Sequence, residues 1–175
     1  MTELENLIAE CISASTVQVF STMLEAQIGP CRVAVETGSP EANDGVVSFI
    51  GLAGSWAGAG SLACSPATAC RACSQMLMTE TTSVNDEVLD AVAELTNMII
   101  GGVKTDLENH LGPLGLSIPT VVYGRNFKTK GAGSTEWVVC SFDWEGEQLV
   151  VKVCLAPSEE ARFPHHLPGH VALEV

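Results

Sequence analysis

Residues 90–102 read DAVAELTNMIIGG, and their spacing predicts the architecture around them. At about 100° per residue, apolar side chains three and four positions apart form one stripe of an amphipathic helix. The opposite stripe carries a carboxylate, Glu94, one turn before a carboxamide, Asn97, and a glycine pair follows. Asn and Gly each cost about 0.7–1 kcal/mol relative to Ala inside a helix, so this face needs an explanation. The apolar stripe contains Val88, Val92, Leu95, Ile99 and Val103, and the polar stripe contains Asp90, Glu94, Asn97, Gly101, Lys104 and Glu108.

Capping signals mark the ends of this helix and of two others. The long helix is expected over residues 84–111, from a capping box at Ser83-x-x-Asp86 to the pair Gly112-Pro113. A first helix over 3–28 opens with Thr2-x-x-Glu5 and closes at Gly29-Pro30. A shorter helix should start at Ser65-Pro66 and run to about Met78. Two long helices that both begin at a capping box, end at Gly-Pro and lead into strands also suggest a duplicated half-domain.

The remaining segments predict strands and hairpins. Alternation and β-branched runs mark six strands, and Ala53-Gly54-Ser55 and Trp144-Glu145-Gly146 mark two hairpin turns. Gly58 and Gly60 suggest a bulge or a helix packed close upon the strand. Hairpins imply antiparallel pairing, so we expect an α+β fold in which both long helices cover one face of an antiparallel sheet. The expected strands are Val33–Val35, Val46–Leu52, Trp56–Cys64, Pro119–Tyr123, Val138–Phe142 and Gln148–Leu155, with a loop over Thr37–Asp44.

Composition indicates a single cytoplasmic domain. A chain of 175 residues that is 46% hydrophobic can bury one sizeable core. We expect this domain over residues 1–156 and a mobile tail rich in Pro, Glu and His over 157–175. A net charge of −13 with eight Lys and Arg disfavours nucleic acid and anionic membranes as partners. The chain has neither a run of about 20 apolar residues nor the basic start of a signal peptide.

The seven cysteines leave a second hypothesis open. Cys64, Cys70 and Cys73 are close in sequence and could form a thiol or zinc site. However, no second CxxC exists, and His165, His166 and His170 lie in the Pro-rich tail. Free cysteine is also a common core residue, so we expect no metal site.

The polar stripe belongs to a longer motif. Asp90-x3-Glu94-x2-Asn97, followed by a Gly, then by Pro119-Thr120-Val121-Val122 and Gly124-Arg125, resembles the signature of the CheX branch of the CheC/CheX/FliY chemotaxis phosphatases. The hairpin from Ile50 to Leu62 is also similar to that family. The likeness extends over residues 1–156 in element order, with its specific part between Asp86 and Arg125.

The resemblance implies both fold and function. It implies a CheC-like fold with pseudo-duplicated halves and hydrolysis of the aspartyl phosphate of a CheY-like response regulator. The residue at Glu94 would engage a lysine of the regulator, and the amide at Asn97 would orient the attacking water. Asp90, Gly101 and Lys104 would border the partner, and the Mg²⁺ would belong to the regulator. Aligning Ser13 with Asp90 places Val17 opposite Glu94 and Phe20 opposite Asn97, so the first half should lack a second site.

The resemblance also implies a homodimer through sheet edges. The late apolar strands Val138–Phe142 and Gln148–Leu155 are the segments in which we expect an exposed edge. Two alternatives to the phosphatase remain: a non-catalytic CheC-like module that binds a regulator or another signalling protein, and the thiol or metal protein. The same polar stripe is also typical of an ordinary solvated helix face.

Overall fold

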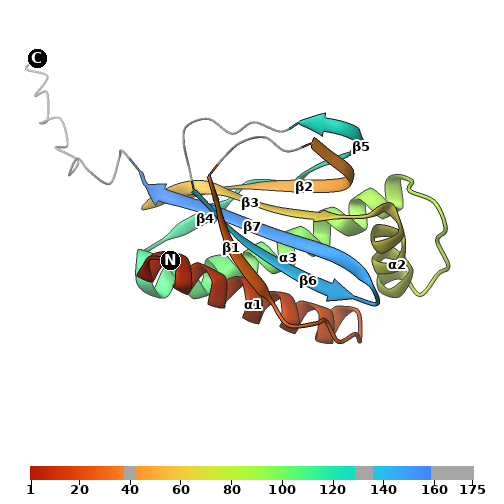
Figure 1. The fold of residues 1–175 in the computed structure, drawn as a ribbon, viewed down its shortest axis with the longest axis horizontal. Coiled ribbons are helices and arrows are strands. Elements are labelled where there is room, and N and C mark those ends of the chain that lie inside the picture. The colour runs from red at the N-terminus through yellow and green to blue at the C-terminus, as the bar shows by residue number, and fades with distance from the viewer. Residues whose placement is uncertain (38–41, 129–135, 159–175) are drawn as a thin grey trace, which may run out of the picture.

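The computed structural model describes residues 1–37, 42–128 and 136–158. Within these ranges, three helices and seven strands follow one another (Figure 1). The helices are α1 (Glu3–Met23), α2 (Pro66–Leu77) and α3 (Asp86–Leu111). The strands are β1 (Arg32–Thr37), β2 (Ala42–Gly54), β3 (Trp56–Cys64), β4 (Leu114–Leu116), β5 (Thr120–Lys128), β6 (Glu136–Trp144) and β7 (Glu147–Pro157).

All strand pairs in the sheet are antiparallel, as expected. The order is β1-β6-β7-β3-β2-β4, and β5 also pairs with β2. Through β5, the strand order is β1-β6-β7-β3-β2-β5. This order reads the same from either end if β1, β2 and β3 are taken as the counterparts of β5, β6 and β7. The sheet therefore has a pseudo-twofold axis between β3 and β7. This symmetry supports the duplicated half-domain that the two similar helix–strand units suggest.

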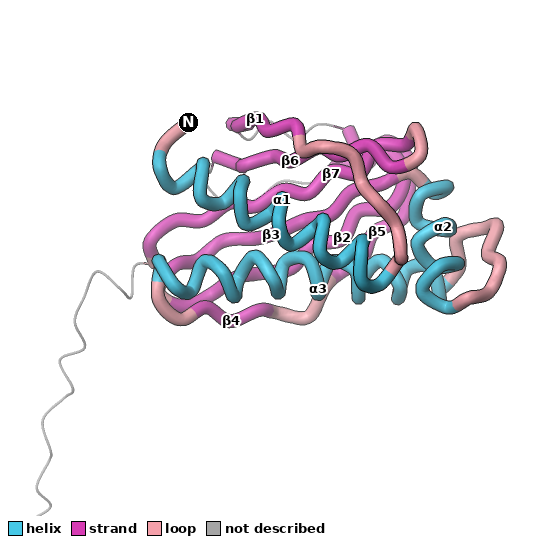
Figure 2. The backbone as a smooth tube through the Cα atoms, turned by 90° about the horizontal axis from the view of Figure 1, so that it is seen from below, coloured by secondary structure: helices cyan, strands magenta, loops and turns pink. Residues whose placement is uncertain are grey.

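Both long helices lie on the same face of the sheet, where Figure 2 shows α1 and α3 side by side. The apolar stripe of α3 is buried as predicted: Val88, Val92, Ile99 and Val103 are fully covered. Each such side chain contributes about 1.5–3 kcal/mol through apolar burial, so the sheet fixes which face of α3 meets solvent. No helix in the described ranges is long and apolar enough to cross a membrane.

Two glycines let the layers approach closely. A Cβ on Gly102 would lie 2.2 Å from Ser15 Oγ of α1, and a Cβ on Gly60 would lie 2.8 Å from a methyl of Ile100. The Ser15 hydroxyl donates to the Ile99 carbonyl at 2.7 Å, which joins α1 to α3 inside the core. Gly60 therefore confirms the close helix that the glycines in its strand suggested, and Gly102 explains half of the glycine pair on α3.

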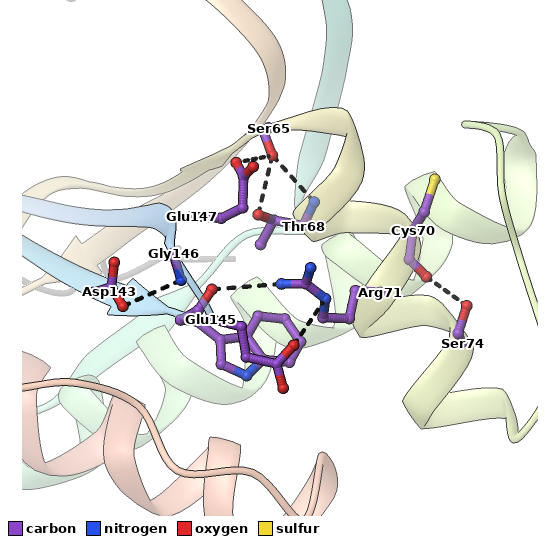
Figure 3. A network of polar contacts seen from close by, with 10 residues as sticks. Ser65, Thr68, Cys70, Arg71, Ser74, Asp143, Glu145, Gly146 and Glu147 are labelled. Carbon is purple, nitrogen blue, oxygen red and sulfur yellow. Dashed lines mark hydrogen bonds and ion pairs between the residues drawn. The ribbon is translucent and has the colours of Figure 1, made fainter.

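A polar network attaches α2 to the β6–β7 turn (Figure 3). Arg71 donates to the Trp144 carbonyl at 3.4 Å, pairs with Glu145 at 3.4 Å, and places its guanidinium 5.4 Å from the Trp144 ring centre. The N-cap hydroxyl of Ser65 donates to Glu147 at 2.8 Å. Glu145 and Gly146 both have positive φ, 52° and 84°, the backbone of a two-residue hairpin turn. The predicted hairpin is thus confirmed, and α2 is held beside the start of α3.

The predicted helix ends need two corrections. Helix α1 ends at Met23 rather than 28, because Leu24 and Ala26 both donate their N–H groups to the Phe20 carbonyl while Glu25 turns left-handed at φ 49°. Helix α3 is capped by Asn85, whose side chain accepts from the Val88 N–H at 3.0 Å, so the proposed box at Ser83 was wrong. The Thr2-x-x-Glu5 box, the Ser65 cap and the stop at Gly112 are confirmed.

The strand predictions differ from the structure in several places. Strand β5 runs to Lys128, five residues beyond the expected end at Tyr123. Strand β2 begins at Ala42, inside the expected loop, of which residues 38–41 lie outside the described residues. The short strand β4 was missed, since Leu-Gly-Leu is too brief to show alternation. Strands β6 and β7, expected at an exposed edge, are both interior, whereas β1 and β4/β5 form the edges. Strand β7 runs to Pro157, one residue beyond the expected domain end, and residues 159–175 of the expected tail lie outside the described ranges.

Candidate functional site

The polar stripe of α3 faces solvent where the sequence placed it. Asp90, Glu94 and Asn97 are exposed, while Gly101 is half-buried one turn further along the helix. Residues at i and i+3 on a helix are neighbours about 5–6 Å apart at Cβ. Glu94 and Asn97 therefore offer a carboxylate and a carboxamide side by side from a helix whose other face is locked in the core.

The exposed side chains of the stripe are uncommitted, meaning that they have no polar partner within the described part of the chain. In the described ranges, the side chains of Asp90, Glu94 and Asn97 make no hydrogen bond or ion pair. A carboxylate can accept hydrogen bonds from a cation, and a carboxamide has both an acceptor and donors. The pair is thus available to a partner without first breaking an internal contact.

Lys104 differs from the other candidate residues. Its ammonium pairs with Glu108 at 2.8 Å, and Glu108 also accepts from the Leu114 N–H at 2.9 Å. The backbone bond to Leu114 and the bond to Lys104 lower the pKa of the Glu108 carboxyl. Lys104 and Glu108 therefore tie the end of α3 to β4, and the structure brings Lys104 together with Glu108 rather than with the Glu94–Asn97 pair.

Gly101 lies beside β4 rather than beside α1. A Cβ built on it would meet only Leu116, at 3.9 Å, which is ordinary contact distance. The chain itself does not require a glycine here, in contrast to Gly102. This is consistent with the expectation that the missing side chain serves an approaching surface.

The first half of the molecule contains no equivalent pair, although the alignment on Ser13 was wrong. Phe20 is fully buried, with its ring centre 5.1 Å from that of Trp144, so it cannot correspond to the exposed Asn97. Buried Thr16 and Thr96 match instead, because each donates to the carbonyl four residues earlier at 2.7 Å. That register places Ala14 opposite Glu94 and Val17 opposite Asn97, both exposed and apolar.

The cysteines behave as core residues. Cys64, Cys70 and Cys73 are buried, and burial raises the pKa of the Cys64 thiol to about 12 and also raises that of Cys70. Thiols held protonated at neutral pH are poor nucleophiles and poor metal ligands. Across the described residues, no three His, Cys, Asp or Glu side chains are grouped so that they could hold a metal. The three histidines of the tail lie outside those residues.

Fold and site together define an α+β domain that presents an uncommitted carboxylate–carboxamide pair on one rigid helix. The sequence profile of the chemotaxis phosphatase CheX matches residues 46–143, which include all of α3. The chain belongs to this family. The comparison with curated proteins gave no match.

Solved structures agree with this assignment. A putative chemotaxis protein from Desulfovibrio vulgaris Hildenborough superposes with a TM-score of 0.77 at 26% identity, over 85% of this chain and 96% of the other. CheX from Vibrio vulnificus gives a TM-score of 0.73 at 25% identity, over 85% and 99%. A chain from the CheX–CheY–BeF3–Mg²⁺ complex of Borrelia burgdorferi gives 0.65 at 25% identity, over 83% and 96%. The CheC-like fold is thereby established.

Proposed function

We propose that this chain hydrolyses the aspartyl phosphate of a CheY-like response regulator, with Asn97 orienting the attacking water and Glu94 docking on a lysine of the regulator. One observation carries the proposal: both side chains are exposed and uncommitted, one turn apart, on the helix at the centre of the family match. The relative from Borrelia burgdorferi, in complex with CheY, BeF3 and Mg²⁺, supports the choice of partner.

The chemistry suits an amide. An acyl phosphate is already activated, so its hydrolysis needs an in-line, oriented water more than a strong base. The Asn97 carbonyl can accept a hydrogen bond from that water while its NH2 donates to a phosphate oxygen. A glutamine performs a comparable task in small GTPases. The proposal assigns the Mg²⁺ to the regulator, which would bring it together with the phosphoryl group.

The helix provides the precision that this mechanism needs. Small displacements of a positioning group lose much of the rate, so the site has to be held by a rigid scaffold. The buried stripe and the Ser15–Ile99 bond hold α3 against the sheet and α1, and the Asn85 cap holds its N-terminal turn. Glu94 then sets the register of docking, and Asp90 and Gly101 border the partner on the same face. Such a role would place the protein in the cytoplasm, with residues 1–156 as the working domain.

A phosphate-release assay tests the proposal. Each purified CheY-like regulator from the same organism is phosphorylated, and the loss of aspartyl phosphate is followed with and without the protein. We expect acceleration for at least one regulator, and Asn97→Ala should abolish it. Asn109→Ala, which removes an exposed Asn elsewhere on α3, is the matched control and should stay active. If Asn97→Ala retained full activity, the mechanism would be wrong. Binding without acceleration by the wild type would instead favour the non-catalytic module.

A further inference from the structure

The exposed stripe of α3 has two unlike borders. On the α1 side the border is mixed, because Gln18 and Thr22 are polar whereas Ala14 and Val17 are exposed and apolar. On the other side lie β4 and β5, both of which contact α3; β4 runs beside it in Figure 2. This second border is apolar, and we name Leu116, Ile118, Val121 and Tyr123 the β4–β5 shelf.

Strand register places three shelf residues on the helix side of the sheet. Leu116 pairs with Leu52, Val121 with Ser48 and Tyr123 with Val46. Leu52, Ser48 and Val46 are all buried beneath the helices, and directly paired residues share one side of a sheet. Leu116 and Val121 pack partly against the core, whereas the Tyr123 side chain is 51% exposed.

Ile118 is held in place although it is exposed. It is 88% exposed between the two strands. The preceding residue, Ser117, donates its N–H to the Gly51 carbonyl at 3.0 Å, and its hydroxyl accepts from the Gly51 N–H at 2.8 Å. Because these hydrogen bonds already hold the backbone beside Ile118, a partner that covers Ile118 orders little additional backbone and loses little conformational entropy. A large aliphatic side chain left in water at such a position gains most from burial at an interface.

The shelf adjoins the proposed catalytic pair. Leu116 lies 3.9 Å from where a Cβ of Gly101 would be, and Gly101 is one turn from Asn97. A stable interface covers roughly 800 Å² on each partner, a patch that extends about 15 Å from its centre. An interface centred on Asn97 therefore reaches the shelf at Leu116. Tyrosine is one of the residues enriched among interface hot spots.

We infer that the β4–β5 shelf is the apolar docking surface for the phosphorylated receiver domain of the regulator. This inference rests on the proposed function. Glu94 and Asn97 supply the polar contacts at the reacting centre, while Ile118 and Tyr123 supply the burial that holds the receiver in place. The shelf residues lie outside the chemistry, so their removal should weaken binding and leave the chemical step intact.

Two exposed apolar residues at the end of α2 provide a matched control. Leu77, the last residue of α2, is 50% exposed, and its C-cap residue Met78 is 91% exposed. The double variant Leu77→Ser/Met78→Ser therefore removes comparable exposed apolar area from outside the shelf.

The test compares the double variant Ile118→Ser/Tyr123→Ser with this control and with the wild type. Dephosphorylation is measured over a range of phosphorylated receiver concentrations, and affinity is titrated with the receiver activated by beryllofluoride and Mg²⁺. We expect KM and Kd to rise at least tenfold for the shelf variant, with kcat within twofold of the wild type. The control should change neither. Equal melting temperatures will show that all variants are folded.

The outcomes separate the two proposals. An active wild type with a shelf variant whose KM and Kd do not change overturns the shelf and leaves the phosphatase proposal standing. A lower kcat at unchanged KM likewise overturns a docking role. A wild type that neither binds nor dephosphorylates any receiver overturns the proposed function, and the shelf with it.

Discussion

Some polar side chains on α3 make polar contacts within the described part of the protein, and others make none. Glu94 and Asn97 are exposed and uncommitted, whereas Lys104 on the same stripe is used internally to join α3 to β4. A helix face that only needed solubility would gain more from pairing its charges at i,i+4, as Lys104 and Glu108 do. The free carboxylate and amide are therefore the residues whose loss should affect function rather than folding.

Substituting these two residues should produce different failures. Glu94→Ala removes a charge-assisted contact of about 1.5–3 kcal/mol, so we expect regulator affinity to fall roughly tenfold to a hundredfold. Asn97→Ala should leave affinity nearly unchanged while dephosphorylation stops. Glu10→Ala, an equal change of charge on an exposed position of α1, controls for the general loss of negative charge. Equal affinities for Glu94→Ala and the wild type would contradict the docking role.

The Cys64 thiol makes stability sensitive to alkaline pH. Its pKa is raised from 9.0 to about 12 by burial. Between these values the unfolded chain has released a proton that the folded chain keeps, so stability should fall as pH rises, by up to about 1.4 kcal/mol per pH unit. Urea unfolding at pH 8, 9 and 10 measures this slope. The variant Cys64→Ala should show a shallower slope, and identical slopes would refute the assignment.

At the scale of elements, the glycine pair of α3 serves two different neighbours. Gly102 allows α1 to cross within reach of the Ile99 carbonyl, while Gly101 faces β4 with room to spare. Both residues cost helix propensity. Packing offsets the cost at Gly102 only.

Alanine should separate the two glycines. Gly102→Ala forces its methyl against Ser15 and should lower the free energy of unfolding by about 1–3 kcal/mol. Gly101→Ala fits and should raise it by about 0.5–1 kcal/mol, while activity falls if the regulator approaches there. Chemical denaturation measures both. Adding Ser15→Ala to Gly102→Ala should cost less than the sum of the single changes, because it removes the nearest atom. An additive double variant would argue against the contact.

For the whole molecule, the sheet topology determines where copies of the chain can associate. Strands β6 and β7 have neighbours on both sides, so only β1 and β4/β5 present open edges in the described part of the sheet. A homodimer built by pairing edges has to use one of these. If the β4–β5 shelf receives the regulator, β1 remains for self-association.

We predict a homodimer through the β1 edge. Light scattering across a range of concentrations should give twice the mass of the 18.4 kDa chain. Val33→Lys, which places a charge on that edge strand, should shift the mass toward the monomer. A monomer at all concentrations would contradict the prediction. A dimer that dissociates on Tyr123→Lys but not on Val33→Lys would place the interface at the other edge.

Local signals in the sequence determined the elements and the exposed face. The spacing of Val88, Val92, Leu95, Ile99 and Val103 predicted the buried side of α3, and with it the exposure of Glu94 and Asn97. Local patterns also predicted the helix caps at Thr2, Ser65 and Gly112 and the turn at Glu145-Gly146. In each case the information lies within a few residues, because helical periodicity and hydrogen bonds at caps and turns are short-range.

Contacts between distant segments decided the rest. Strand β4, the interior position of β6 and β7, the crossing at Gly102 and the apolar border at Leu116 and Ile118 all depend on residues far apart in the chain. The end of α1 at Met23 rests on a left-handed Glu25, a conformation that glutamate rarely adopts and that no local pattern indicates. The sequence by itself thus determined which side of α3 meets solvent. Only the tertiary structure decided what lies beside it, because strand order and layer packing follow from burial across the whole chain.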